Sequence, residues 1–233
     1  MKKILLSTLI FAPIIAFSDD WTPPVTHSLM IMSEKELGTP KALKEENFNR
    51  QREMTLNGYV NKEENRYAQF LFGLKKNSFD EIRAFRGNSD PTDTHLKKSP
   101  NEIKLAFSYK KLPINEKSII GYAPIGSYVE KPKEGWNGIK TFFEKDGLGI
   151  CAYEFTDLKL SNGGVILEKE KVKYSVNNKP TLTLVEGSES SGYVYSVTWY
   201  NDTKVSQLDC ASKSFNKDSI DKMIQFAKQI DKN

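Results

Sequence analysis

The sequence predicts an α+β fold: an antiparallel β-sheet with a C-terminal α-helix packed on one face and a less regular N-terminal part. Two observations predict it. Between residues 139 and 211, short segments of alternating or apolar residues are separated by turn sequences, as in a chain of antiparallel strands. The segment that follows carries apolar residues at helical spacing instead. Before residue 139 the pattern is less regular.

The first segment of the chain predicts an export signal. Lys2 and Lys3 precede an apolar run over residues 4–17, which is long enough for the core of a secretory signal but short for a bilayer span. Ala16 and Ser18 are the small residues that a signal peptidase requires before its cut. We therefore expect residues 1–18 to be removed, and the protein to reach the periplasm or the outside of a bacterial-type cell.

Residues 19–233 are expected to form a single globular domain. Residues 19–38 read as an extended leader, and a subdomain boundary near residue 125 is left open because residues 121–138 are rich in glycine and proline. No segment after residue 18 reaches 18 consecutive apolar residues, so no membrane span is expected there.

The N-terminal elements are expected in the following order. Residues 41–52 form a helix with a poor apolar stripe. Residues 66–74 alternate as a strand, although a helix remains open for so short an apolar run. Residues 88–100 form an exposed polar loop. Residues 103–109 alternate apolar and polar side chains and predict a half-buried strand.

The C-terminal elements begin with a hairpin, in which residues 139–144 and 148–155 flank the turn dipeptide Asp146-Gly147. Residues 165–176 carry charge on both faces in their middle and predict an edge strand or a protruding arm. Strands are expected over residues 181–185, 193–200 and 204–211. A helix over residues 217–231 closes the chain and is expected to cover the sheet with its apolar stripe.

Charge and composition argue against a nucleic-acid partner. The chain has 34 Lys and Arg against 30 Asp and Glu, a net charge of +4, and removal of the signal lowers this by two. The basic residues alternate with acids, as in residues 168–171, whereas a nucleic-acid footprint requires clustered basic residues. The expected partner is instead a protein, a glycan or another envelope component.

The two cysteines, Cys151 and Cys210, predict one disulfide, because the compartment reached by export is oxidising. A reactive thiol is the alternative. No histidine lies near either cysteine in sequence and there is no C-x-x-C motif, so the disulfide is favoured.

Motifs for catalysis or cofactor binding are missing from the sequence. Asp90, Asp93 and His95 resemble part of a metal site, but they lack the glycine and terminal glutamate of a calcium loop and a second ligand pair at zinc spacing. A solvated turn is the favoured explanation of these residues, and no metal or cofactor is expected. G-x-S-x-G, H-E-x-x-H and phosphate-binding glycine motifs do not occur, so the question of enzymatic activity stays open and a non-enzymatic role is favoured.

Aromatic residues are the remaining candidates for a binding surface. Tyr193, Tyr195 and Trp199 share one face of a predicted strand and are expected in the core. Tyr153 and Tyr200 are the members expected to be exposed, as a possible ligand face.

Three functional hypotheses follow. The first is an exported, non-enzymatic binding or envelope-associated protein. The second is a secreted effector or host-facing factor. The third is a hydrolase whose carboxylates converge only in the folded chain.

Overall fold

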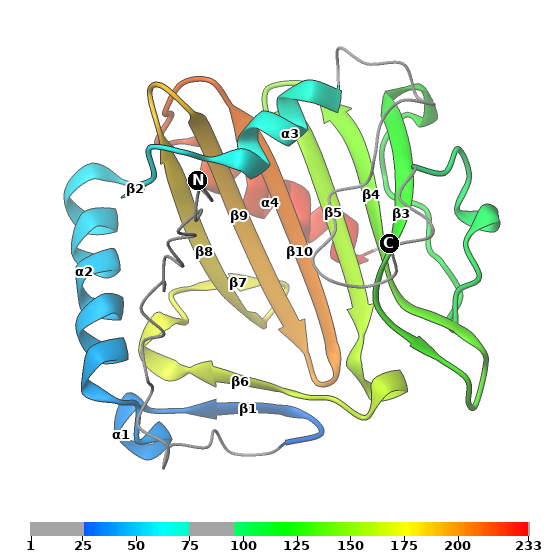
Figure 1. Ribbon diagram of the computed structural model, residues 1–233, viewed down its shortest axis with the longest axis horizontal. Helices are drawn as coiled ribbons and strands as arrows, with labels where there is room; N and C mark the ends of the chain where they lie inside the picture. Colours follow the sequence, from blue (N-terminus) through cyan, green and yellow to red (C-terminus); the bar gives the residue numbers. More distant parts are fainter. Residues whose placement is uncertain (1–25, 75–95, 233) are drawn as a thin grey trace, which may run out of the picture.

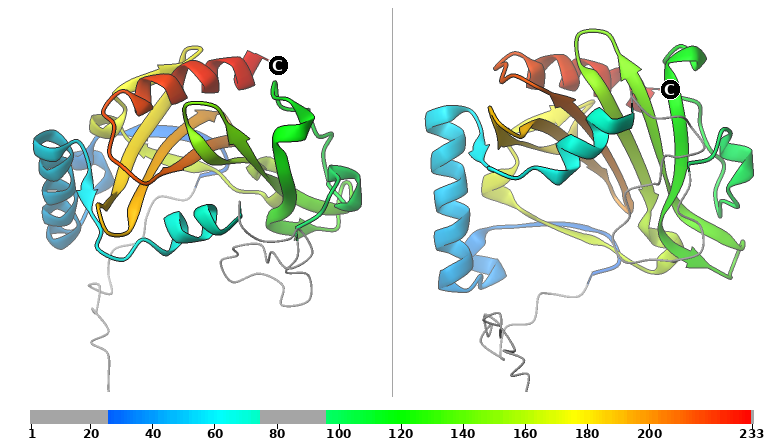
Figure 2. Two further views of the ribbon diagram at one scale, coloured as in Figure 1. Left: turned by 90° about the horizontal axis from the view of Figure 1, so that it is seen from above. Right: turned by 45° about the horizontal axis from the view of Figure 1, so that its top comes forward.

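The computed structural model describes residues 26–74 and 96–232. Its main feature is an eight-stranded sheet in the order β2-β8-β9-β10-β5-β4-β3, with β7 also paired to β8 (Figure 1). The strands of this sheet are β2 (Val60–Asn61), β3 (Ile119–Val129), β4 (Gly135–Lys145), β5 (Gly149–Asp157), β7 (Tyr174–Val176), β8 (Lys179–Ser188), β9 (Gly192–Asn201) and β10 (Lys204–Ser212). The sheet lies between two helices, α3 (Arg66–Leu74) on one face and α4 (Ser219–Lys232) on the other (Figure 2).

The remaining elements are short or lie at the periphery of this sheet. They are β1 (Leu29–Met32), α1 (Glu34–Leu37), α2 (Lys41–Asn57), β6 (Val165–Glu168) and the 3₁₀ helices η2 (Pro100–Glu102), η3 (Glu116–Ser118), η4 (Leu158–Ser161) and η5 (Lys169–Lys171). Thus an α+β architecture with a C-terminal helix is confirmed, and the helices are few.

The C-terminal hairpins form where turn residues predict them. β4 and β5 pair antiparallel around Gly147, whose φ of +74° is the left-handed conformation that a tight turn requires. β9 and β10 pair antiparallel around Asp202, which also has a positive φ. Consecutive strands joined by tight turns must run in opposite directions, so this part of the sheet is antiparallel as expected.

The prediction of a wholly antiparallel sheet is wrong at two pairings. β2 runs parallel to β8 at the edge of the main sheet, and β1 runs parallel to β6 in a separate two-stranded sheet. Both pairs join segments that are more than a hundred residues apart in sequence. No hairpin constrains their direction, and nothing in the local pattern reveals it.

The strand predicted over residues 103–109 does not form. After η2 the chain runs irregularly along the edge of the sheet, with one isolated bridge between Leu105 and Trp136. Its alternate side chains still face inward, because Ile103 packs with Tyr122 and Ile139 while Leu105 and Phe107 pack against them. The alternation therefore records burial of one side of the segment and not a strand ladder.

Residues 66–74 form a helix and not the strand first expected. Asn65 caps the helix, since its side-chain oxygen accepts a hydrogen bond from the Ala68 amide at 3.1 Å. Ala68, Leu71 and Leu74 are buried at a spacing of three, which places them on one helical face against the sheet. The apolar residues of so short a run fit both the two-residue repeat of a strand and the three-to-four-residue repeat of a helix.

Three further segments can be compared with what the sequence predicts. The segment expected to be an extended leader contains β1 and α1, whose first turn is held by a capping box between Ser33 and Glu36. Ile125, near which a subdomain boundary was left open, lies inside β3. The charged segment over residues 165–176 divides into β6, which leaves the main sheet, and β7, which pairs with β8 alone.

Helix α4 packs the main core against the sheet. Its buried side chains include Met223, Ile224 and Ala227, which contact the β9 face that carries Tyr195, Val197 and Trp199. The predicted core role of this aromatic face is confirmed, since Trp199 is only 2% exposed. Near the C-terminal end of α4, however, the helix does not cover the sheet completely, and a cavity remains.

Candidate functional site

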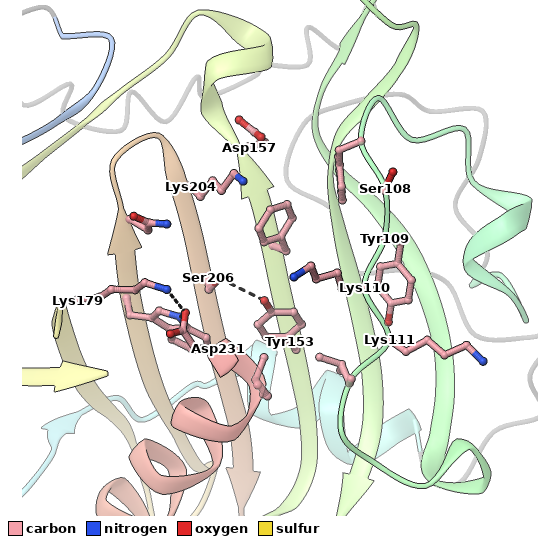
Figure 3. Close-up of a pocket in the computed structure, with 16 residues that line it drawn as sticks. Ser108, Tyr109, Lys110, Lys111, Tyr153, Asp157, Lys179, Lys204, Ser206 and Asp231 are labelled. Carbon is pink, nitrogen blue, oxygen red and sulfur yellow. Dashed lines mark hydrogen bonds and ion pairs between the residues drawn. The ribbon is translucent and has the colours of Figure 1, made fainter. Parts of the chain in front are cut away.

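The cavity has a volume of about 410 Å³ and lies on the α4 side of the sheet (Figure 3). Strands β5, β9 and β10 form its floor, the last turn of α4 forms one wall, and residues 107–112 form another. Its lining comprises Phe107, Ser108, Tyr109, Lys110, Lys111, Leu112, Tyr153, Phe155, Asp157, Lys179, Trp199, Asn201, Lys204, Ser206, Ile230 and Asp231. Five separate parts of the chain therefore meet around one space: residues 107–112, β5, the start of β8, the β9–β10 hairpin and the end of α4.

Strand register explains why the floor is aromatic. Trp199 is opposite Ser206 in the β9–β10 pair, and Ser206 is opposite Phe155 in the β10–β5 pair. Residues opposite each other across neighbouring strands point to the same face, so these three side chains are directed toward α4. Tyr153, two residues before Phe155, stacks on Trp199 with ring centroids 5.9 Å apart. The floor is thus rigid and mainly apolar.

Tyr153 contributes a neutral hydroxyl to this floor. Its phenol oxygen lies 3.2 Å from the Ser206 Oγ, within hydrogen-bonding distance. Burial raises the pKa of Tyr153 to about 12, so the phenol stays protonated at neutral pH. Tyr153 can therefore donate or accept a hydrogen bond, but it is not a base.

Asp231 closes the end of the cavity beside α4. It forms an ion pair with Lys179, accepts a hydrogen bond from the Trp199 Nε1 at 3.0 Å and accepts another from the Asn177 side chain at 2.9 Å. Burial alone would raise the pKa of Asp231, but these donors outweigh it and the pKa is lowered. The carboxylate is thus held ionised and occupied by neighbouring donors, which makes it a structural group and not a general acid.

Lysines surround the opening. Lys110 points into the cavity toward the rings of β5, whereas Lys111 points away from it (Figure 3) and pairs with Glu116 at 2.8 Å. Lys204 extends from β10 at the far end, beside Asp157, its register partner on β5. The site therefore combines an apolar floor with a basic rim.

The lining offers little for catalysis. Among the described residues that line the cavity there is no histidine and no cysteine, and the Ser206 hydroxyl lies within hydrogen-bonding distance of the neutral Tyr153 hydroxyl. A serine nucleophile needs an adjacent base, which this pair does not supply. The arrangement can bind and orient a ligand.

The two tyrosines expected to form one ligand face lie on opposite faces of the sheet. Tyr153 faces α4, whereas Tyr200 is opposite Val205 and points to the α3 side. Tyr153 is also not exposed as expected: only 7% of it is accessible, because it packs against Trp199 beneath the cavity. Only Tyr153 belongs to the candidate site.

The other predicted residues are placed as follows. Cys151 and Cys210 form the predicted disulfide, which joins directly opposed positions of β5 and β10. Asp90, Asp93 and His95 lie outside the described residues. Within residues 26–74 and 96–232, no group of three or more potential His, Cys, Asp or Glu ligands gathers, and no helix has the length and apolar character to cross a bilayer.

A second polar cluster, which the sequence analysis missed, lies on the opposite face beneath α3. Lys140 on β4 forms an ion pair with Glu154 on β5, and the Tyr67 hydroxyl of α3 donates to Asp209 on β10 at 3.2 Å. Lys140 is 7% exposed and Asp209 1%. Burial, opposed in part by hydrogen bonds, raises the pKa of Asp209 above its ordinary value, and the nearby Glu154 adds to this effect. The signal for this cluster in the sequence is Lys140, a lysine within the apolar strand predicted over residues 139–144.

Comparisons with known proteins give no match to a family model, a curated protein or a solved structure.

Proposed function

We propose that this chain is an exported, non-enzymatic binding protein that holds a small ligand in the cavity between α4 and strands β5, β9 and β10. The cavity carries the proposal. Its volume of about 410 Å³ falls within the usual range for small-molecule sites, and its apolar floor with a few polar groups is typical of them. The ligand enters beside residues 107–112.

Export is supported by the disulfide and by the signal-like N-terminus. A disulfide such as Cys151–Cys210 is stable in the periplasm or outside the cell, whereas the cytosol keeps thiols reduced. Lys2, Lys3 and the apolar run that follows have the composition of a cleavable signal.

The hydrolase alternative needs two acids in an open cleft, one of them with a raised pKa. Asp209 has the raised pKa and Glu154 lies near it, but Asp209 is buried beneath α3 on the side of the sheet away from the cavity. In the cavity itself, the pKa of Asp231 is lowered. The geometry therefore favours binding over hydrolysis.

A pair of adjacent substitutions on β10 tests the proposal. Ser206→Phe places a ring on the cavity floor, while Val205→Phe places the same ring on the opposite face of the sheet. Binding of a mixed set of small organic fragments would be measured by saturation-transfer NMR on the oxidised protein. We expect Ser206→Phe to weaken cavity-bound fragments by at least about tenfold, and Val205→Phe to leave them bound.

Circular dichroism and the unfolding temperature establish that both variants fold. If Ser206→Phe is unstable, Asn201→Trp at the exposed rim provides a second means of obstructing the cavity. Fragments that bind the folded Ser206→Phe and Asn201→Trp variants as tightly as the original chain would show that the cavity is not the binding site.

A further inference from the structure

We infer that the ligand of this cavity is an organic anion with a flat apolar body, such as an aromatic or alicyclic carboxylate, sulfonate or phosphate ester. The inference rests on the proposed function, because it names the ligand class of the same site. It follows from two features of the lining, an excess of positive charge and an apolar surface that is partly accessible.

Four lysines and two carboxylates line the cavity, but one of the lysines, Lys111, points away from it and pairs with Glu116. Both carboxylates are already engaged within the protein. Asp231 is paired with Lys179, and Asp157 accepts a hydrogen bond from the Lys159 amide at 3.2 Å as the cap of η4. Since Lys179 is paired with Asp231 and Lys111 with Glu116, the charges that remain along the lining are those of Lys110 and Lys204 against that of Asp157. The field at the opening therefore favours an anion.

Lys110 and Lys204 are the lysines best placed to meet the anionic group. Lys110 directs its amino group over the floor near Tyr153, and Lys204 extends from the opposite side of the opening (Figure 3). Both lysines are exposed, and the several rotatable bonds of a lysine side chain allow its ammonium group to reach a bound oxygen. The neutral hydroxyls of Tyr153 and Ser206 add hydrogen-bonding capacity below them.

The apolar part of the ligand has a defined place. Phe155 is only partly buried and packs against Phe107 with ring centroids 5.0 Å apart, while Ile230 and Leu112 line the neighbouring walls. Trp199 lies too deep to present its face, which disfavours a sugar that would stack on an open tryptophan ring. A flat apolar group against Phe155 and Phe107 satisfies this surface better.

The test compares two fluorescent probes that differ by one sulfonate group. Both 8-anilinonaphthalene-1-sulfonate and N-phenyl-1-naphthylamine carry the same ring system, and only the first is an anion. We expect the original chain to bind the sulfonate about tenfold more tightly, and added salt to weaken the sulfonate and not the neutral probe.

Substitution of single lysines tests which of them strengthen binding of the sulfonate. Lys110→Gln and Lys204→Gln should each weaken sulfonate binding by about threefold to tenfold and leave the neutral probe unchanged. Lys111→Gln is the matched control, because Lys111 is adjacent in sequence but points away from the cavity and pairs with Glu116. It removes the same charge and should change neither probe.

The outcomes separate the inference from the proposed function. If both probes are displaced by Ser206→Phe but bind equally, with no effect of Lys110→Gln or Lys204→Gln, the cavity is a binding site and the anion inference is wrong. If Lys111→Gln weakens the sulfonate as much as Lys110→Gln does, general surface charge explains the preference and the inference is again wrong. If Ser206→Phe displaces neither probe, the proposed function fails.

Discussion

At the scale of single residues, the least expected feature is the buried charge beneath α3. Lys140 carries one positive charge, Glu154 one negative charge, and Asp209 would add a second negative charge if ionised. Desolvation opposes that second charge, and the pKa of Asp209 is raised accordingly. The cluster holds α3 to the sheet through the Tyr67 hydroxyl.

Asp209→Asn should therefore stabilise the protein at neutral pH. An acid whose pKa is raised on folding contributes most stability below its unfolded pKa of about 4, and this contribution is lost as pH rises through the folded value. The asparagine keeps an acceptor for Tyr67 and has no such loss. Urea unfolding from pH 4 to 8 should show that the free energy of unfolding of the variant increases relative to that of the original chain as pH rises. A constant difference across this range would contradict the account.

Lys140→Met should have the opposite effect, because it leaves Glu154 without its partner. We expect the free energy of unfolding to fall by about 2–3 kcal/mol, less than for a fully buried pair because the Glu154 side chain stays 25% exposed. Lys111→Met, at an exposed ion pair, is the control and should leave the free energy of unfolding almost unchanged. If Lys140→Met and Lys111→Met lowered the free energy of unfolding by the same amount, the ion pair of Lys140 would stabilise the fold no more than an exposed one.

At the scale of elements, the sequence predicts what turns and periodicity determine. The β4–β5 hairpin around Gly147 and the helix α4 form close to their predicted positions. Residues 66–74 and 103–109 do not form the predicted strands, because their spacing records which side chains are buried and not which hydrogen bonds form. β1 pairs with β6 and β2 pairs with β8, both in parallel. These partners are too distant in sequence for a local pattern to predict the pairing.

The disulfide between β5 and β10 should contribute much of the net stability. Its two cysteines are 59 residues apart, a separation for which the loss of chain entropy in the unfolded state is worth roughly 4 kcal/mol. The Cys151→Ala/Cys210→Ala variant should lose about this much in urea unfolding, and the reduced original chain should lose a similar amount. A loss below about 1 kcal/mol in both would mean that the sheet does not depend on the crosslink.

At the scale of the whole molecule, export and ligand binding are the two linked proposals. In a bacterial expression host, the secreted or periplasmic chain should begin at Asp19 when its N-terminus is sequenced. Ser18→Tyr should block cleavage, because the peptidase requires a small residue at that position, whereas Ser28→Tyr should not. Recovery of the original chain from the cytosol with residues 1–18 attached would contradict the export proposal.

The cavity is a feature of the whole molecule, because segments that are distant in sequence form its walls. The sequence alone therefore did not predict it. Its walls come from residues 107–112, β5, the β9–β10 hairpin and the end of α4, and no local pattern relates these segments. The sequence predicts that Tyr153 is exposed, yet its place in the site comes from the register that puts it beneath the opening. Lys110 and Ser206 carried no signal before the fold was known.

Amide chemical-shift mapping during titration with 8-anilinonaphthalene-1-sulfonate tests the central claim most directly. If the ligand occupies the cavity, the largest shifts should fall on residues 108–112, on Ser206 and on Ile230 and Asp231. Shifts concentrated instead on the α3 face, around Tyr200 and Val205, would show that this protein binds its ligand elsewhere.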